Sequence, residues 1–91
     1  MTPRQIELAR HALGLPNKRR CSYRNHFVAG RGHNDYTEWC DMTAPGNGYA
    51  IRLDGGKLTG NDFCFVLTEK GAKAALSKGE KLDPEDFPVA A

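Results

Sequence analysis

Apolar and polar positions follow a helical period at the start of the chain. Apolar side chains recur three or four positions apart on one face, which comprises Ile6, Leu8, Ala9, Ala12, Leu13 and Leu15. Thr2 can cap a helix, Pro3 suits its first turn, and Gln5 stands where a capping box requires it. The pattern therefore predicts a helix over Pro3–Leu13, ended by Gly14.

The following segment, residues 17–34, has no sustained period. Weak alternation over Cys21–Val28 indicates a short strand before Gly30 and Gly32, while a short helix over Lys18–His26 is the alternative. The pattern alone does not choose between the two.

Clearer signals return in the second half. A helix is expected from Asp35 to the "APGNG" break, because its acidic start and apolar spacing are typical of a capped helix. The β-rich runs Tyr49–Leu53 and Phe63–Leu67 flank a glycine-rich loop and predict a hairpin. Thr68 can cap a last helix, which we expect to end near Gly79.

The length of 91 residues suits one domain. The element order predicts an α+β fold, a small winged-helix-like domain over residues 1–79 with the order α-(β)-α-β-β-α. Residues 80–91 contain two prolines and four acidic residues, so we expect an acidic C-terminal tail that docks at most through Phe87.

The stretch "GYAIRLDGGKLTGNDFCFVLTEKGAKAAL" resembles the wing hairpin and following helix of winged-helix regulators of the multiple-antibiotic-resistance-regulator type. Thr68–Gly71 would match the threonine-to-glycine turn of that family. The resemblance implies a winged-helix fold and nucleic-acid binding. The chain departs from the family in its "EWCDMTAPG" helix, which is acidic where a DNA-reading helix is basic.

The stretch "RNHFVAGRGH" looks similar to small uncharacterised proteins of phage and prophage genomes. That resemblance implies no particular activity. It implies a protein that works inside a bacterial host, and binding to a host protein is one way in which such small proteins act.

Charge is unevenly distributed, although the net charge is only +2. Residues 1–34 contain seven basic residues and one acidic residue, whereas residues 35–91 contain six basic and ten acidic ones. Basic side chains with interleaved aromatics suit phosphate contact and base stacking. The nucleic-acid-binding candidates are Lys18, Arg19, Arg20, Tyr23, Arg24, His26 and Arg31, with Lys57 near the wing tip.

The acidic end of the chain provides an alternative, which is binding to a host enzyme or to a defence complex in the manner of an anti-CRISPR protein. Acidic side chains would steer the encounter and one aromatic side chain would anchor it. The candidate contacts are Asp83, Glu85, Asp86 and Phe87.

A second alternative is a structural zinc module. Two cysteines and two histidines can hold tetrahedral zinc, although their spacing of four, six and six residues lacks the usual close pairs. The candidate ligands are Cys21, His26, His33 and Cys40. We otherwise expect no cofactor.

Catalytic motifs are not recognisable, and we expect no enzyme activity. Cys21 with His26, or Cys40 with His33, could form a nucleophile–base pair, but neither stands in a recognisable nucleophile motif. The N-terminus lacks the apolar region of a signal peptide, and three cysteines do not suggest a disulfide framework, so we expect a cytoplasmic protein.

Overall fold

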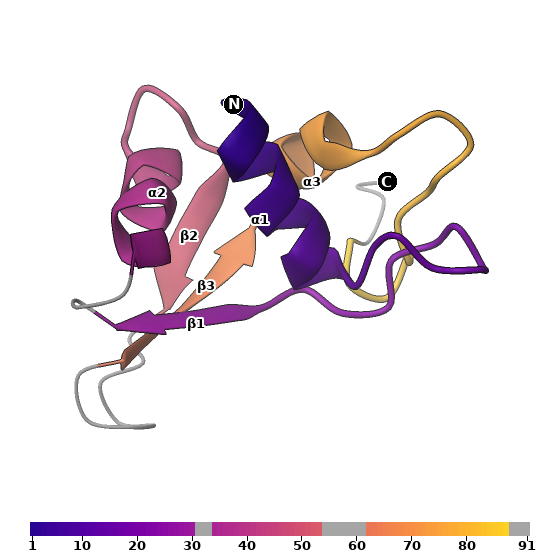
Figure 1. Cartoon of the computed structure of the whole chain (residues 1–91), viewed down its shortest axis with the longest axis horizontal. Helices are drawn as coiled ribbons and strands as arrows, with labels where there is room; N and C mark the ends of the chain where they lie inside the picture. The colour runs from indigo at the N-terminus through magenta and orange to yellow at the C-terminus, as the bar shows by residue number, and fades with distance from the viewer. Residues whose placement is uncertain (31–33, 54–61, 88–91) are drawn as a thin grey trace.

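The computed structural model describes residues 1–30, 34–53 and 62–87, which form three helices and a three-stranded antiparallel sheet (Figure 1). In chain order the elements are α1 (Pro3–Leu13), β1 (Phe27–Gly30), α2 (Asn34–Thr43), β2 (Ala50–Leu53), β3 (Asp62–Leu67) and α3 (Glu69–Ala75). The expected α+β class and the order of the elements are confirmed. No helix in the described part of the chain is both long and apolar enough to cross a membrane.

Helix α1 begins and ends at the predicted residues. The Thr2 hydroxyl accepts a hydrogen bond from the Gln5 backbone N–H at 3.1 Å, and the Gln5 side chain accepts one from the Thr2 backbone N–H at 3.0 Å. Gly14 adopts φ 80°, and its N–H donates to the carbonyls of the last turn. Both helix ends are thus satisfied by local contacts.

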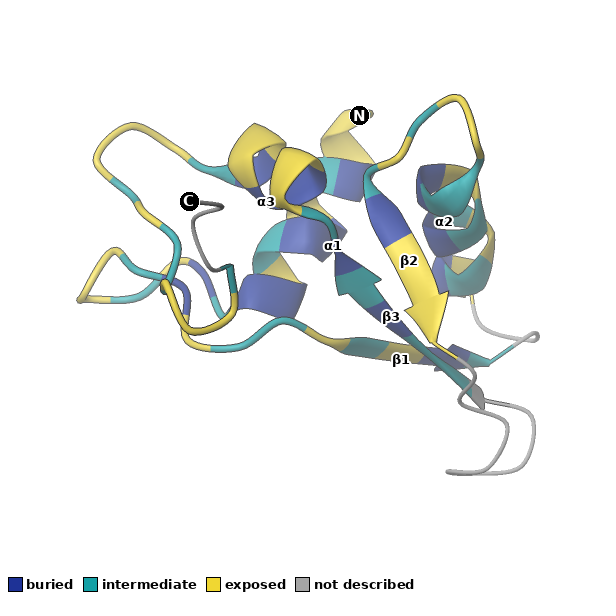
Figure 2. Cartoon of the chain, turned by 180° about the vertical axis from the view of Figure 1, so that it is seen from behind, coloured by how far each residue is buried: buried dark blue, intermediate teal, exposed yellow. Residues whose placement is uncertain are grey.

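The sheet has the strand order β1-β3-β2, so the second strand of the hairpin lies in the centre. The register pairs Val28 with Cys64 and Cys64 with Leu53, which places these residues on one face. Val28 and Leu53 are exposed, as is Ile51 on the same face, and Figure 2 shows β2 in yellow after its buried first residue, with no helix over it in that view.

The opposite face of the sheet holds the core. The Trp39 ring of α2 lies 5.2 Å from the ring of Phe27 and 5.5 Å from that of Phe65, centroid to centroid. Trp39 and Phe65 are completely buried. Since large aromatic side chains contribute most of the burial energy in small cores, this cluster holds α2 against the sheet.

Helix α3 starts at the predicted cap, where the Thr68 hydroxyl accepts a hydrogen bond from the Gly71 backbone N–H at 3.1 Å. Close packing explains why the last residue of "LTEKG", Gly71, is a glycine. A Cβ at Gly71 would lie 2.0 Å from the backbone carbonyl oxygen of Tyr49, the residue before β2. Glycine therefore lets the start of α3 contact the hairpin backbone directly.

The predicted end of the last helix was wrong. α3 ends at Ala75, and Leu76 is extended with ψ 141°, whereas we expected the helix to reach Gly79. Arg10 Nη1 donates to the Ala75 carbonyl, and the Glu80 carboxylate accepts from the Ser77 N–H. The first contact is tertiary and the second is local, and both bind backbone groups that another helical turn would have used.

Segment 17–26 is neither of the predicted elements. The strand begins at Phe27 rather than near Cys21, and no helix forms over Lys18–His26. Instead, the backbone N–H groups of Tyr23 and His26 donate to carbonyls of α1. Because this extended segment bonds to the end of α1 and not to a strand, its apolar positions follow neither a helical nor a strand period.

Candidate functional site

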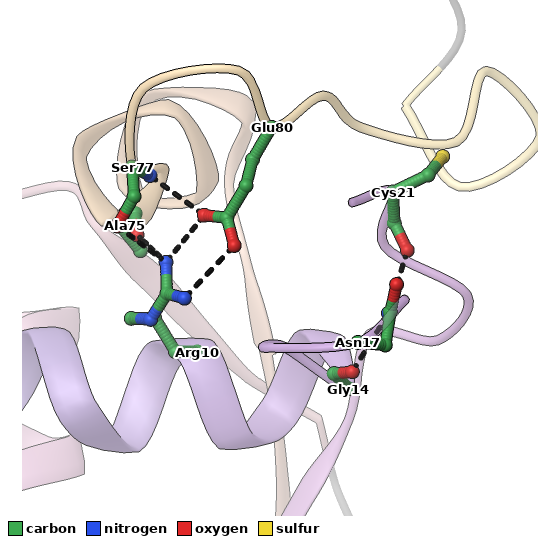
Figure 3. Close-up of polar contacts among 7 residues, drawn as sticks. All are labelled: Arg10, Gly14, Asn17, Cys21, Ala75, Ser77 and Glu80. Carbon is green, nitrogen blue, oxygen red and sulfur yellow. Dashed lines mark hydrogen bonds and ion pairs between the residues drawn. The ribbon is translucent and has the colours of Figure 1, made fainter. Parts of the chain in front are cut away.

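The three consecutive cations of the basic segment lie on one loop. Lys18, Arg19 and Arg20 are all exposed there. The loop is closed by Asn17, whose Nδ2 donates to the carbonyl oxygens of Gly14 and Cys21, each at 2.9 Å (Figure 3). The three cations therefore lie on a turn that is stabilised by the hydrogen bonds of Asn17.

A second loop, from near the C-terminus, lies beside the first. Lys81 N–H donates to the Arg20 carbonyl and Ser22 N–H to the Lys81 carbonyl, both at 3.0 Å. Arg20 has φ 53°, and its carbonyl is the acceptor of the first of these bonds. Figure 1 shows the two loops side by side at one end of the molecule.

This contact adds two lysines that sequence reasoning missed. Lys78 and Lys81 are exposed on the second loop, more than fifty positions along the chain from the first one. We call the combined group the basic end, and it consists of Lys18, Arg19, Arg20, Lys78 and Lys81. In the part of the chain that the structure describes, none of the five forms an ion pair. No local signal in "LSKGEKL" reveals this pairing.

A largely buried ion pair holds the second loop in place. Arg10 Nη1 and Nη2 contact the two carboxylate oxygens of Glu80 at 2.5 and 2.9 Å, and the side chains are only 18% and 7% exposed (Figure 3). The hydrogen bond from Arg10 lowers the pKa of Glu80, with smaller contributions from the Ser77 N–H and from Arg20. The negative charge of Glu80 is therefore paired mainly with Arg10, while Arg20 of the basic end also interacts with it.

The aromatic and basic residues after the turn have different surroundings. Tyr23 is 58% exposed. Arg24 lies with its guanidinium carbon 5.3 Å from the centre of the Tyr23 ring, and its Nη2 donates to the His11 carbonyl at 2.8 Å. Arg24 thus contacts the C-terminal end of α1, where a cation is favoured, while His26 is exposed.

Two of the predicted nucleic-acid contacts, Arg31 and Lys57, lie outside the described residues. Their place relative to the basic end therefore stays a prediction.

The zinc candidates are not brought together. Cys21 lies in the loop beside Lys81, whereas Cys40 is on α2, at the other end of the molecule in both views (Figures 1 and 2). His33 lies outside the described residues. Among the residues that are described, no group of three or more metal-binding side chains occurs, and all three cysteines are free thiols.

The acidic candidates lie next to the basic end. Asp83 N–H donates to the buried Ser22 hydroxyl at 2.8 Å, and Asp83 Oδ1 accepts from the Glu85 N–H at 2.9 Å. Glu85 and Asp86 are exposed, while Phe87 is partly buried against the protein's own core. A partner that used Phe87 as an anchor would have to displace it. Residues 80–87 are thus attached to the rest of the chain, and the division at residue 79 stays a prediction.

The carboxylates of α2 have structural partners. Arg4 Nη2 donates to Asp35 at 2.6 Å. The buried Gln5 amide donates to Glu38 at 3.3 Å and to Asp41 at 2.7 Å. These contacts join α2 to α1, so the acidic residues serve packing between the two helices.

Comparison of this chain with family models, with curated proteins and with solved structures finds no match.

Proposed function

We propose that this protein is a non-enzymatic nucleic-acid-binding protein that contacts phosphates through the basic end. The observation that carries the proposal is the pairing of the two loops. Backbone hydrogen bonds between Arg20, Ser22 and Lys81 join two loops from distant parts of the sequence, and both loops carry exposed cations. Clustered, exposed and unpaired cations are what a phosphate backbone binds, because each contact releases condensed counterions.

The acidic helix α2 is not part of this proposal. Its carboxylates bond to Arg4 and Gln5 of α1, and a helix of that charge would repel phosphates. We propose that the fold is a modified winged helix in which β2 and β3 form the wing. In this interpretation the basic end contacts the phosphates in place of α2. The support for it is the order of the elements and the capped turn at Thr68.

Binding at two salt concentrations tests the proposal. We would measure fluorescence anisotropy of labelled single- and double-stranded DNA and RNA with the wild type and with Arg19→Ala/Lys81→Ala, which removes one cation from each loop. We expect the double variant to bind about tenfold more weakly at low salt. The slope of log affinity against log salt should fall by about two, because two phosphate contacts are lost.

A matched control is Arg52→Ala/Lys70→Ala, which removes the same two residue types elsewhere. Arg52 lies over the Phe63 ring and Lys70 over the Tyr49 ring, and neither residue belongs to the basic end. This variant should bind within about twofold of the wild type. Equal losses in both double variants, or no binding of any nucleic acid at low salt, would overturn the proposal.

A further inference from the structure

Beside the basic end lies a cavity of about 290 Å³, lined in part by Lys18, Arg19, Tyr23 and Asp83. The volume lies at the lower limit of the range usual for ligand sites, so the cavity suits a single flat ring rather than a whole cofactor. Its lining combines an aromatic side chain, two cations and one carboxylate.

Tyr23 lines this cavity and is fixed in place by contacts with the end of α1. Its backbone N–H donates to the Leu13 carbonyl at 3.2 Å. Its ring packs on Gly14, where a Cβ would lie 2.2 Å from Tyr23 Cε1. Tyr23 is 58% exposed as a residue and is fixed at its base, so the part of its ring that Gly14 does not cover offers a stacking surface with little loss of side-chain entropy. A base that stacks there would share the ring with the Arg24 guanidinium, whose carbon lies 5.3 Å from the ring centre.

The carboxylate of Asp83 favours a base over a phosphate in this cavity. Its backbone N–H donates to the Ser22 hydroxyl, and its Oδ1 accepts from the Glu85 N–H, so the carboxyl group is held in place. A carboxylate repels a phosphate but accepts hydrogen bonds from the amino group of a base. In a bound nucleotide the phosphates would therefore contact Lys18 and Arg19, and a neutral ring would lie next to Asp83.

We propose that this cavity is a subsite for one unpaired nucleobase whose pairing edge carries an amino group, with Tyr23 stacking on the ring and Asp83 accepting from the amino group. This inference rests on the proposed function and adds two properties to it. The protein prefers single strands, because a base inside a duplex cannot enter the cavity. It also prefers cytosine to uracil, which offers a carbonyl in place of the amino group.

The test compares labelled RNA oligomers of cytosine and of uracil, equal in length, with an RNA duplex of mixed sequence. We expect the wild type to bind oligocytosine about tenfold more tightly than oligouracil. Asp83→Asn keeps the acceptor for the Glu85 N–H but removes the charge, and should reduce this ratio to about twofold or less. Tyr23→Leu should weaken binding to both single strands about tenfold and leave duplex binding within twofold.

Tyr23→Phe is the matched control, because it retains the ring and should bind like the wild type. The subsite is overturned if the wild type binds both oligomers equally, or if Tyr23→Leu lowers single-strand and duplex binding alike. In either case, binding that still responds to Arg19→Ala/Lys81→Ala leaves the proposed function standing. Absence of all binding overturns both.

Discussion

The two ends of this molecule are stabilised by different kinds of contact. Around the sheet, the fully buried Trp39 of α2 packs on the fully buried Phe65 of β3, and polar contacts between α2 and α1 add to this apolar core. At the basic end, two loops are joined by backbone hydrogen bonds, the buried Ser22 hydroxyl and the ion pair between Arg10 and Glu80. Apolar burial contributes more free energy per residue than such polar contacts do. The first end should therefore determine whether the chain folds, and the second how its loops are placed.

The largest effect is expected from Gly71→Ala. The added methyl group would meet the Tyr49 backbone carbonyl, which cannot move without displacing the hairpin. We expect the free energy of unfolding, measured by urea denaturation, to fall by roughly 3 kcal/mol. Gly46→Ala is the control, since a Cβ there has no heavy atom within 4 Å. A similar loss in both variants would show that close approach at Gly71 is not the cause.

An intermediate effect is expected from Glu80→Gln. Losing the charge of Glu80 weakens its contact with Arg10, and we expect about 2 kcal/mol of lost stability at neutral pH. Glu69→Gln is the control, since the pair of Glu69 with Lys73 is exposed and should contribute about 0.5 kcal/mol or less.

The effect of Glu80→Gln on stability should depend on pH. The pKa of Glu80 in the folded protein lies below its ordinary value of 4.5, so the stabilisation is present above that value. It is lost as the pH falls through the lowered pKa, because the protonated carboxyl no longer pairs with Arg10. The stability difference between the wild type and Glu80→Gln, followed by urea denaturation at several pH values, should shrink in that acid range. A difference that stays constant there would contradict the assignment.

The smallest effect is expected from Ser22→Ala, which removes the acceptor for the Asp83 backbone N–H. We expect about 1 kcal/mol of lost stability. In hydrogen exchange, the amides of Ser22 and Lys81 should exchange faster, whereas that of Phe65 should follow only the change in global stability. Equal acceleration at both ends would mean that the two regions open as one unit, and the contrast between them would fail.

Elements with local signals were predicted well from the sequence. The boundaries of α1 follow from Thr2, Gln5 and Gly14, and the start of α3 follows from Thr68, because each signal acts within four residues. The hairpin strands were predicted within one residue at each end for a similar reason, since β-rich runs flank a glycine-rich loop.

The candidate site was only half predicted. The exposed cations Lys18, Arg19 and Arg20 follow from composition, because solvated basic runs lie at the surface. Lys78 and Lys81 do not, since they belong to residues 35–91, where acidic residues outnumber basic ones. Their place depends on hydrogen bonds to residues about sixty positions away.

By itself, the sequence determined α1, α2, the two hairpin strands and the start of α3, together with the unequal distribution of charge, because periodicity, caps and composition are local properties. Only the tertiary structure decided that α3 stops at Ala75, that Glu80 is paired with Arg10, and that two loops from distant parts of the chain are joined by backbone hydrogen bonds. The physical reason is that these features are contacts between residues far apart in the chain. Such contacts exist only once the apolar core around Trp39 has brought the helices and the sheet together.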